Sequence, residues 1–114
     1  MPANIAPQRF FVTVGEIPNA AVDCTGLLDA GELISTLTSV LEITTTNLTI
    51  DNKAISAVEL TINGVAVATG KAITFRVAGV LSGITYRIQS KFVTNSTPAA
   101  TRICDVHMIG VAAS

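Results

Sequence analysis

Alternation of apolar and polar residues in two neighbouring segments constrains the fold of this chain more than any other feature. Every second residue is apolar from Ile73 to Val77, and the same pattern runs over a longer span from Ile84 to Phe92, where Ser90 is the one polar residue on the apolar parity. Successive side chains of a strand point to opposite faces, so a period of two predicts antiparallel strands with one buried and one solvated face. The side chains expected to point inward are Ile73, Phe75, Val77, Ile84, Tyr86, Ile88 and Phe92.

Turn signals divide the rest of the second half into further strand candidates. Asn63-Gly64 lies between the apolar runs 58–62 and 65–68, and both residues tolerate the positive φ of a two-residue hairpin. Other turns are expected at residues 69–71, 81–83 and 94–98, and the last strand at residues 102–111. Counting the whole chain gives about seven or eight short strands, which in 114 residues is typical of a β-sandwich or a small barrel.

The first half of the chain is less regular. Residues 9–14 are a strand candidate, and residues 32–46 form a long, Thr-rich segment. A helix could open at residues 29–32, but the Thr and Val residues that follow favour a strand. In residues 32–46 the more apolar parity is that of Leu33, Ser35, Leu37, Ser39, Leu41 and Ile43.

The first twenty residues stand apart because Pro2, Pro7, Gly15 and Pro18 interrupt any regular pattern. A frayed terminus is one interpretation. The other is an extended arm that lies on a neighbouring subunit and adds the strand at residues 10–14 to another sheet edge. We therefore divide the chain into an N-terminal arm, residues 1–20, and a sandwich domain, residues 21–114. The candidate assembly contacts are Arg9, Phe10, Phe11, Val12 and Val14.

Charge and composition exclude several classes of partner. Only 13% of the residues are charged, about half the usual share, so a surface of neutral side chains favours association. The seven basic residues are scattered and Trp is absent, which argues against a nucleic-acid partner. No apolar stretch approaches the ~20 residues of a membrane span, and the first residues lack a signal-peptide pattern, so we expect no membrane partner.

Residues with catalytic or metal-binding chemistry are few. The single histidine, His107, has Asp105 two positions away on the same strand face, but no nucleophile motif accompanies them, so we interpret the pair as cross-strand hydrogen bonding on an outer sheet face. Cys24 and Cys104 are expected to be buried free thiols, with a disulfide as the alternative. Clustered metal ligands and phosphate-binding glycine loops are missing. We therefore predict no enzyme activity and no cofactor.

Several segments in a fixed order resemble a family of proteins. They are Val22-Asp23-Cys24-Thr25-Gly26-Leu27-Leu28, Gly31-Glu32-Leu33-Ile34-Ser35-Thr36, a Thr-rich strand reaching Leu48-Thr49-Ile50-Asp51, Val77-Ala78-Gly79-Val80-Leu81-Ser82-Gly83-Ile84-Thr85-Tyr86, and the final strands at residues 87–92 and 102–111. From Val22 onward the chain resembles small bacteriophage virion structural proteins with an immunoglobulin-like β-sandwich. In such domains the Tyr of the Gly-x-Thr-Tyr segment fastens a loop.

The resemblance implies an all-β, immunoglobulin-like sandwich and a role in the virion. The expected function is that of a capsid decoration or cement protein, which binds and stabilises the shell of the major capsid protein as a homo-oligomer, with a trimer as one form. Its expected location is the capsid surface, after assembly in the host cytoplasm. A tail, fibre or baseplate component remains the alternative within the virion. A carbohydrate- or cell-surface-binding module and an enzyme built around His107 are the alternatives outside that class.

Overall fold

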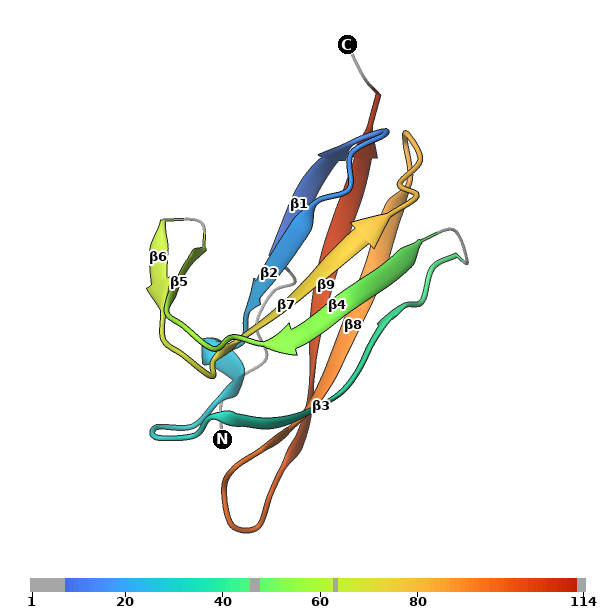
Figure 1. Ribbon diagram of the computed structural model, residues 1–114. Coiled ribbons are helices and arrows are strands. Elements are labelled where there is room, and N and C mark those ends of the chain that lie inside the picture. Colours follow the sequence, from blue (N-terminus) through green and yellow to red (C-terminus); the bar gives the residue numbers. More distant parts are fainter. Residues whose placement is uncertain (1–7, 46–47, 63, 113–114) are drawn as a thin grey trace.

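The computed structural model describes residues 8–45, 48–62 and 64–112, and these residues form an all-β protein with one short turn of 3-10 helix (Figure 1). The strands are β1 (Gln8–Thr13), β2 (Asn19–Asp23), β3 (Ile34–Glu42), β4 (Thr49–Ile55), β5 (Leu60–Ile62), β6 (Val65–Val67), β7 (Ala72–Ala78), β8 (Thr85–Thr94) and β9 (Thr101–Val111); the 3-10 turn is Thr25–Leu27. The predicted all-β class is thereby confirmed.

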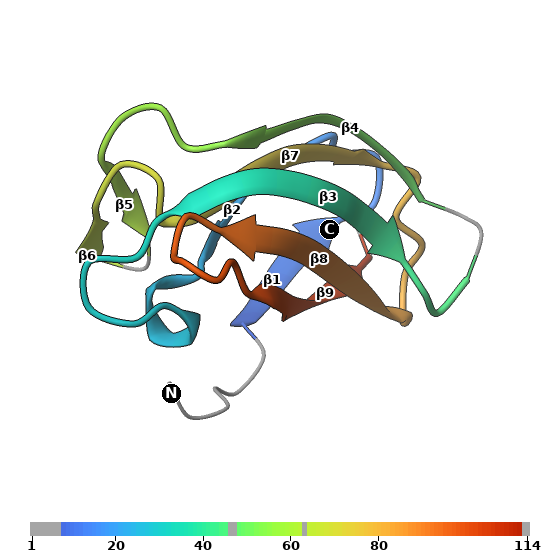
Figure 2. The same ribbon diagram turned by 90° about the horizontal axis from the view of Figure 1, so that it is seen from below.

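The strands form two main sheets and a separate hairpin. The order is β1-β9-β8-β3 in the four-stranded sheet and β2-β7-β4 in the three-stranded sheet, while β5 and β6 pair only with each other. Figure 2 shows β4 and β7 in one layer and β8 and β9 in another. All pairings are antiparallel except that of β1 with β9, which is parallel. This pairing corrects the expectation of antiparallel strands throughout.

One hydrophobic core is shared by the two main sheets. The large buried apolar side chains are Ile73, Phe75 and Val77 on β7 and Tyr86, Ile88 and Phe92 on β8. These positions follow the predicted period of two, and Ile84 packs partly buried against the same core. Burial of each large apolar side chain contributes about 1.5–3 kcal/mol, so the alternating strands supply much of the stability of the fold.

Strand β3 does not follow the parity that its sequence suggests. Leu41 and Ile43 are about half exposed, whereas Ile34 and Val40 are buried. The register of β3 against β8 shifts between Ile34 and Thr36 and again between Leu37 and Ser39. Each irregularity inserts a residue and exchanges the two faces of the strand, so no single parity describes it. The more apolar parity of residues 32–46 is therefore largely on the surface.

The hairpin expected at Asn63-Gly64 is present between β5 and β6, where Ile62 pairs with Val65. Gly64 has a φ of 79°, which is the conformation that this turn requires. Asn63 itself lies outside the described residues. The buried side chains of Ile62, Val67 and Ala72 form a second, smaller core beneath the hairpin.

The expected boundary between an arm and a domain at residue 20 falls inside β2. Strand β1 (Gln8–Thr13) belongs to the four-stranded sheet and β2 begins at Asn19 in the three-stranded sheet. Residues 8–20 are therefore part of the folded body, and the structure corrects the expectation of an extended arm at these positions. The expectation for residues 1–7 lies outside the described residues.

The turn before β8 packs tightly against β9. The Leu81 N–H donates a hydrogen bond of 2.9 Å to the Tyr86 hydroxyl, as expected for a Tyr that fastens a loop. Gly83 N–H donates to the Gly110 carbonyl, and Gly110 N–H donates to the Ile84 carbonyl, each at 3.0 Å. A Cβ atom on Gly110 would lie 1.9 Å from the Leu81 carbonyl oxygen, so only glycine permits this approach.

The two cysteines are free and buried in the shared core, as predicted. A hydrogen bond with the Cys104 thiol and burial both raise the pKa of Cys24 far above its ordinary value. The Cys24 thiol therefore stays protonated near neutral pH. Both cysteines pack as small apolar side chains.

Candidate functional site

Strand β1 forms one edge of the four-stranded sheet and carries all the predicted assembly residues except Val14, which follows the strand directly. It pairs with β9 on one side, and no other described strand pairs with its second side. An edge strand presents unpaired N–H and C=O groups that a further strand can bind. The residue positions that the sequence singled out thus coincide with an open sheet edge.

The side chains of this segment alternate between core and surface. Phe11 is 71% exposed, and Arg9 and Val14 are also on the surface. Val12 is buried and Phe10 packs partly buried against the core. The structure therefore brings Arg9, Phe11 and Val14 to the surface, while Val12 packs in the core.

A groove of about 240 Å³ opens between β1 and β2, where the two main sheets meet along this edge. It is lined by Phe10, Phe11, Val12, Pro18, Asn19, Ala20, Ala21, Thr61, Ile62 and Met108. Most of these side chains are apolar, and no titratable group is among them. The groove suits an apolar side chain of a partner better than a polar substrate.

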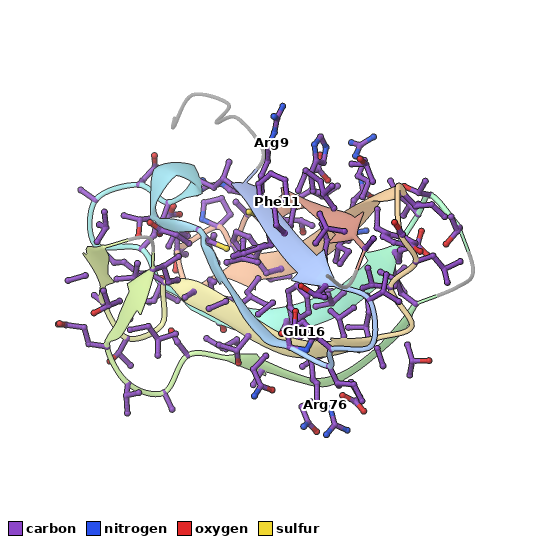
Figure 3. All side chains as sticks on the ribbon, turned by 90° about the horizontal axis from the view of Figure 1, so that it is seen from above. Arg9, Phe11, Glu16 and Arg76 are labelled. Atoms are coloured by element: carbon purple, nitrogen blue, oxygen red, sulfur yellow. The ribbon has the colours of Figure 1, made fainter. Side chains whose placement is uncertain are left out.

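The outward face of the four-stranded sheet extends from Phe11 and Arg9 across β9 and β8. Arg9 pairs in register with His107, and His107 pairs with Arg87 on its other side. Two residues further along β1, Phe11 pairs with Ile109. Figure 3 shows Arg9 and Phe11 on one side of the molecule and Arg76 on the other. We call this surface the basic sheet face, and its residues are Arg9, Phe11, Leu41, Arg87, Lys91, Ile103, Asp105, His107 and Ile109.

Asp105 is the one acidic residue on the basic sheet face. Its Oδ2 atom accepts a hydrogen bond of 2.8 Å from Arg87 Nη2, which is the cross-strand pairing expected for this carboxylate. Its Oδ1 atom is buried and has no hydrogen-bond partner in the described part of the chain. Because half of the Arg87 side chain is exposed, the ion pair contributes little to stability. The carboxylate thus leaves the positive charges of Arg9 and Lys91 unneutralised.

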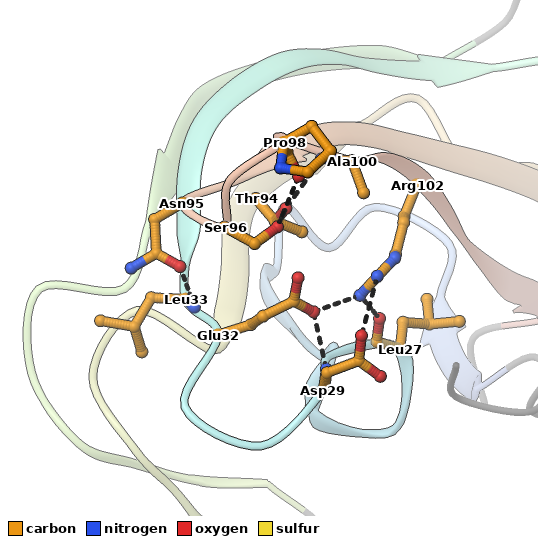
Figure 4. Close-up of polar contacts among 10 residues, drawn as sticks. All are labelled: Leu27, Asp29, Glu32, Leu33, Thr94, Asn95, Ser96, Pro98, Ala100 and Arg102. Carbon is orange, nitrogen blue, oxygen red and sulfur yellow. Dashed lines mark hydrogen bonds and ion pairs between the residues drawn. The ribbon is translucent and has the colours of Figure 1, made fainter.

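A second polar cluster lies at the far end of β9 and was not found from the sequence. Arg102 Nη1 donates to Glu32 Oε1 and to the Leu27 carbonyl, each at 2.5 Å, and Arg102 Nη2 lies 3.4 Å from Asp29 Oδ2 (Figure 4). The Asp29 N–H also donates to Glu32 Oε1 at 2.7 Å. These contacts fasten the loop between β2 and β3 onto β9.

The ionisation of Glu32 reflects this cluster. The hydrogen bond from the Asp29 backbone, a hydrogen bond with Ser96 and the Arg102 guanidinium together lower the pKa of Glu32 to about 2. A carboxylate that is ionised at all moderate pH values and held by three partners is unsuited to act as a general acid or base. The cluster is therefore structural. Arg102 is distant in the sequence from the residues that it contacts, so no local sequence signal could have revealed it.

Within residues 8–45, 48–62 and 64–112, no group of three or more His, Cys, Asp or Glu side chains is placed to hold a metal ion. In the same part of the chain, no helix has the length and apolar character needed to cross a membrane. Comparison with protein-family models, with curated proteins and with solved structures gave no match. The basic sheet face and its open β1 edge are thus the surface that the geometry supports as a binding site for a partner.

Proposed function

We propose that this protein is a structural component of a phage virion, which decorates the capsid and stabilises the shell of the major capsid protein. The observation that carries the binding role is the open β1 edge, where Phe11 is 71% exposed beside an apolar groove. A large aromatic side chain at a sheet edge is a common anchor for a protein partner. The assignment to a virion rests on the resemblance of the segments from Val22 onward.

The fold that we propose is an immunoglobulin-like β-sandwich. In that fold the seven strands A to G form the sheets A-B-E-D and C-F-G. If the β5-β6 hairpin is an insertion, the order β2-β7-β4 corresponds to B-E-D and β3-β8-β9 to C-F-G. The first strand then pairs with G instead of B. The hydrogen bond from Leu81 to Tyr86 occupies the position of the tyrosine corner and supports the same assignment.

A binding role without catalysis fits the chemistry of the surface. His107 lies on an open sheet face, its neighbour Asp105 is paired with Arg87, and the groove at the β1 edge holds no titratable side chain. Catalysis requires converging acid, base or nucleophilic groups in a site that excludes water. We therefore propose that the protein has no enzyme activity and binds no cofactor. We also propose that it associates as a homo-oligomer on the capsid surface.

Electron cryomicroscopy of purified virions tests the location. We expect density that fits the two sheets to lie on the outer surface of the capsid, in contact with the major capsid protein. Density for this chain on the tail, fibre or baseplate and none on the capsid would contradict the cement role.

Binding of the purified protein to capsids that lack it tests the role of the β1 edge. Phe11→Ser removes burial worth about 1.5–3 kcal/mol, so the Kd for capsids should rise about tenfold to a hundredfold. The matched control is Val58→Ser, because Val58 is 62% exposed and lies outside β1 and the basic sheet face. Equal binding by the two variants, with unchanged thermal stability of both, would refute a contact at this edge.

A further inference from the structure

We propose that the basic sheet face docks against a carboxylate-rich protein surface, so that the capsid partner presents Asp and Glu side chains around an apolar patch. This inference rests on the proposed capsid-binding function and specifies the chemistry of the partner. It is carried by the distribution of charge between this face and the rest of the molecule.

The charge distribution is uneven. The basic sheet face holds Arg9, Arg87 and Lys91, which are three of the seven basic residues of the chain, and only Asp105 of its eight acidic residues. The whole chain has a net charge of −1, so the rest of the molecule is acidic while this face is positive. Complementary potentials of this kind steer association and exclude partners with the same sign of charge.

Apolar side chains lie between the charges. Leu41 is 55% exposed and Ile103 is 50% exposed. Each is the direct cross-strand partner of a residue on β8, which is Gln89 for Leu41 and Lys91 for Ile103. Alternating apolar and cationic side chains suit a protein partner, because protein–protein interfaces combine buried apolar contacts with charged groups at the rim. A nucleic acid would require a denser row of cations, because its affinity depends on neutralising many phosphates.

Two ion pairs on opposite sheets provide a matched experiment. Arg87 pairs with Asp105 on the basic sheet face, and Arg76 pairs with Asp51 on the three-stranded sheet at 2.7 Å. Both arginines are nearly half exposed. The test variant is Arg87→Glu with Lys91→Glu, and the control is Arg76→Glu with Lys53→Glu. The two double variants have the same net charge. A single variant, Arg9→Glu, repeats the test on the same face and leaves the ion pair of Arg87 with Asp105 intact.

Retention on poly-L-glutamate beads measures the chemistry of the face without the capsid. We expect the wild type and the control to be retained at about 50 mM salt and released at high salt, since exposed charges are screened beyond about 10 Å at 0.1 M. The test variant and Arg9→Glu should elute earlier, with at least a tenfold loss of retention. Similar elution of the test and control variants would overturn the inference.

Capsid binding separates this inference from the proposed function. If the wild type binds capsids and the test variant binds within twofold of the control, the capsid role stands and the acidic partner surface is refuted. If the wild type fails to bind capsids but the test variant and Arg9→Glu lose retention on poly-L-glutamate and the control does not, the proposed function fails and the preference of this face for carboxylates is supported. Thermal unfolding of every variant confirms that each is folded at the assay temperature.

Discussion

Replacing Gly110 by Ala tests the packing of the turn before β8 against β9. A Cβ atom at this position would lie 1.9 Å from the Leu81 carbonyl oxygen and 2.8 Å from Val80 Cγ1, whereas ordinary contacts begin near 3.4 Å. The turn must therefore move away by about 1.5 Å, which is the difference between 3.4 Å and 1.9 Å. The methyl group cannot be accommodated by a side-chain rotation, because the closest atom belongs to the backbone.

The cost of that movement follows from the contacts it disturbs. Overpacking a well-packed site costs about 1–3 kcal/mol. The displacement also strains the hydrogen bonds that join Gly110 to Gly83 and Ile84, each worth about 1 kcal/mol. We therefore expect Gly110→Ala to lower the free energy of unfolding by about 3 kcal/mol. With a urea m-value of about 2 kcal/mol/M, the unfolding midpoint falls by about 1.5 M.

Equilibrium unfolding in urea, followed by circular dichroism, measures the effect. Val111→Ala on the same strand is the control, because Val111 is on the surface and its truncation should cost less than about 1 kcal/mol. A Gly110→Ala midpoint within about 0.2 M of the wild-type value would refute the argument that β9 and the Leu81 turn are in backbone contact.

Two further predictions concern stability. Tyr86→Phe removes the acceptor of the Leu81 N–H, so the free energy of unfolding should fall by about 1 kcal/mol and the thermal midpoint by several degrees. An unchanged thermal midpoint would show that this hydrogen bond is absent in solution. Glu32 has a folded pKa of about 2 and an ordinary value of 4.5, so its ionisation stabilises the native state above pH 4.5, and this contribution is lost as the pH falls toward 2. The stability difference between wild type and Glu32→Gln, measured by urea unfolding from pH 7 to pH 2.5, should therefore shrink below pH 4.5; a constant difference would contradict the contacts of this carboxylate.

The sequence predicts the local strands well where burial alternates simply. Residues 73–77 and 84–92 are read correctly because each has one face in the core along its whole length. Strand β3 is different, since two register irregularities change which parity faces inward, and Leu41 reaches the surface although it belongs to the more apolar parity. Such irregularities depend on the partner strand and leave no local signal in the sequence.

Long-range pairing accounts for the parts of the site that sequence reasoning missed. Phe11 was identified as a contact residue, but its place beside Ile109 depends on a parallel pairing between the two most distant strands of the described chain. The ion pair of Arg102 with Glu32 likewise joins a loop to β9 across most of the sequence. Neither arrangement follows from spacing or composition, because the residues concerned are brought together only by the sheet order.

The pairing of β1 with β9 has a consequence for the time at which the surface appears during translation. Phe11 and Arg9 are made early, but the strand that supports them, Thr101–Val111, is made last among the described elements. At about 5–20 residues per second, a ribosome needs on the order of ten seconds to cover that interval. The nascent chain therefore lacks the finished four-stranded sheet until β9 has been made, and neighbouring chains on one messenger cannot associate through it before then.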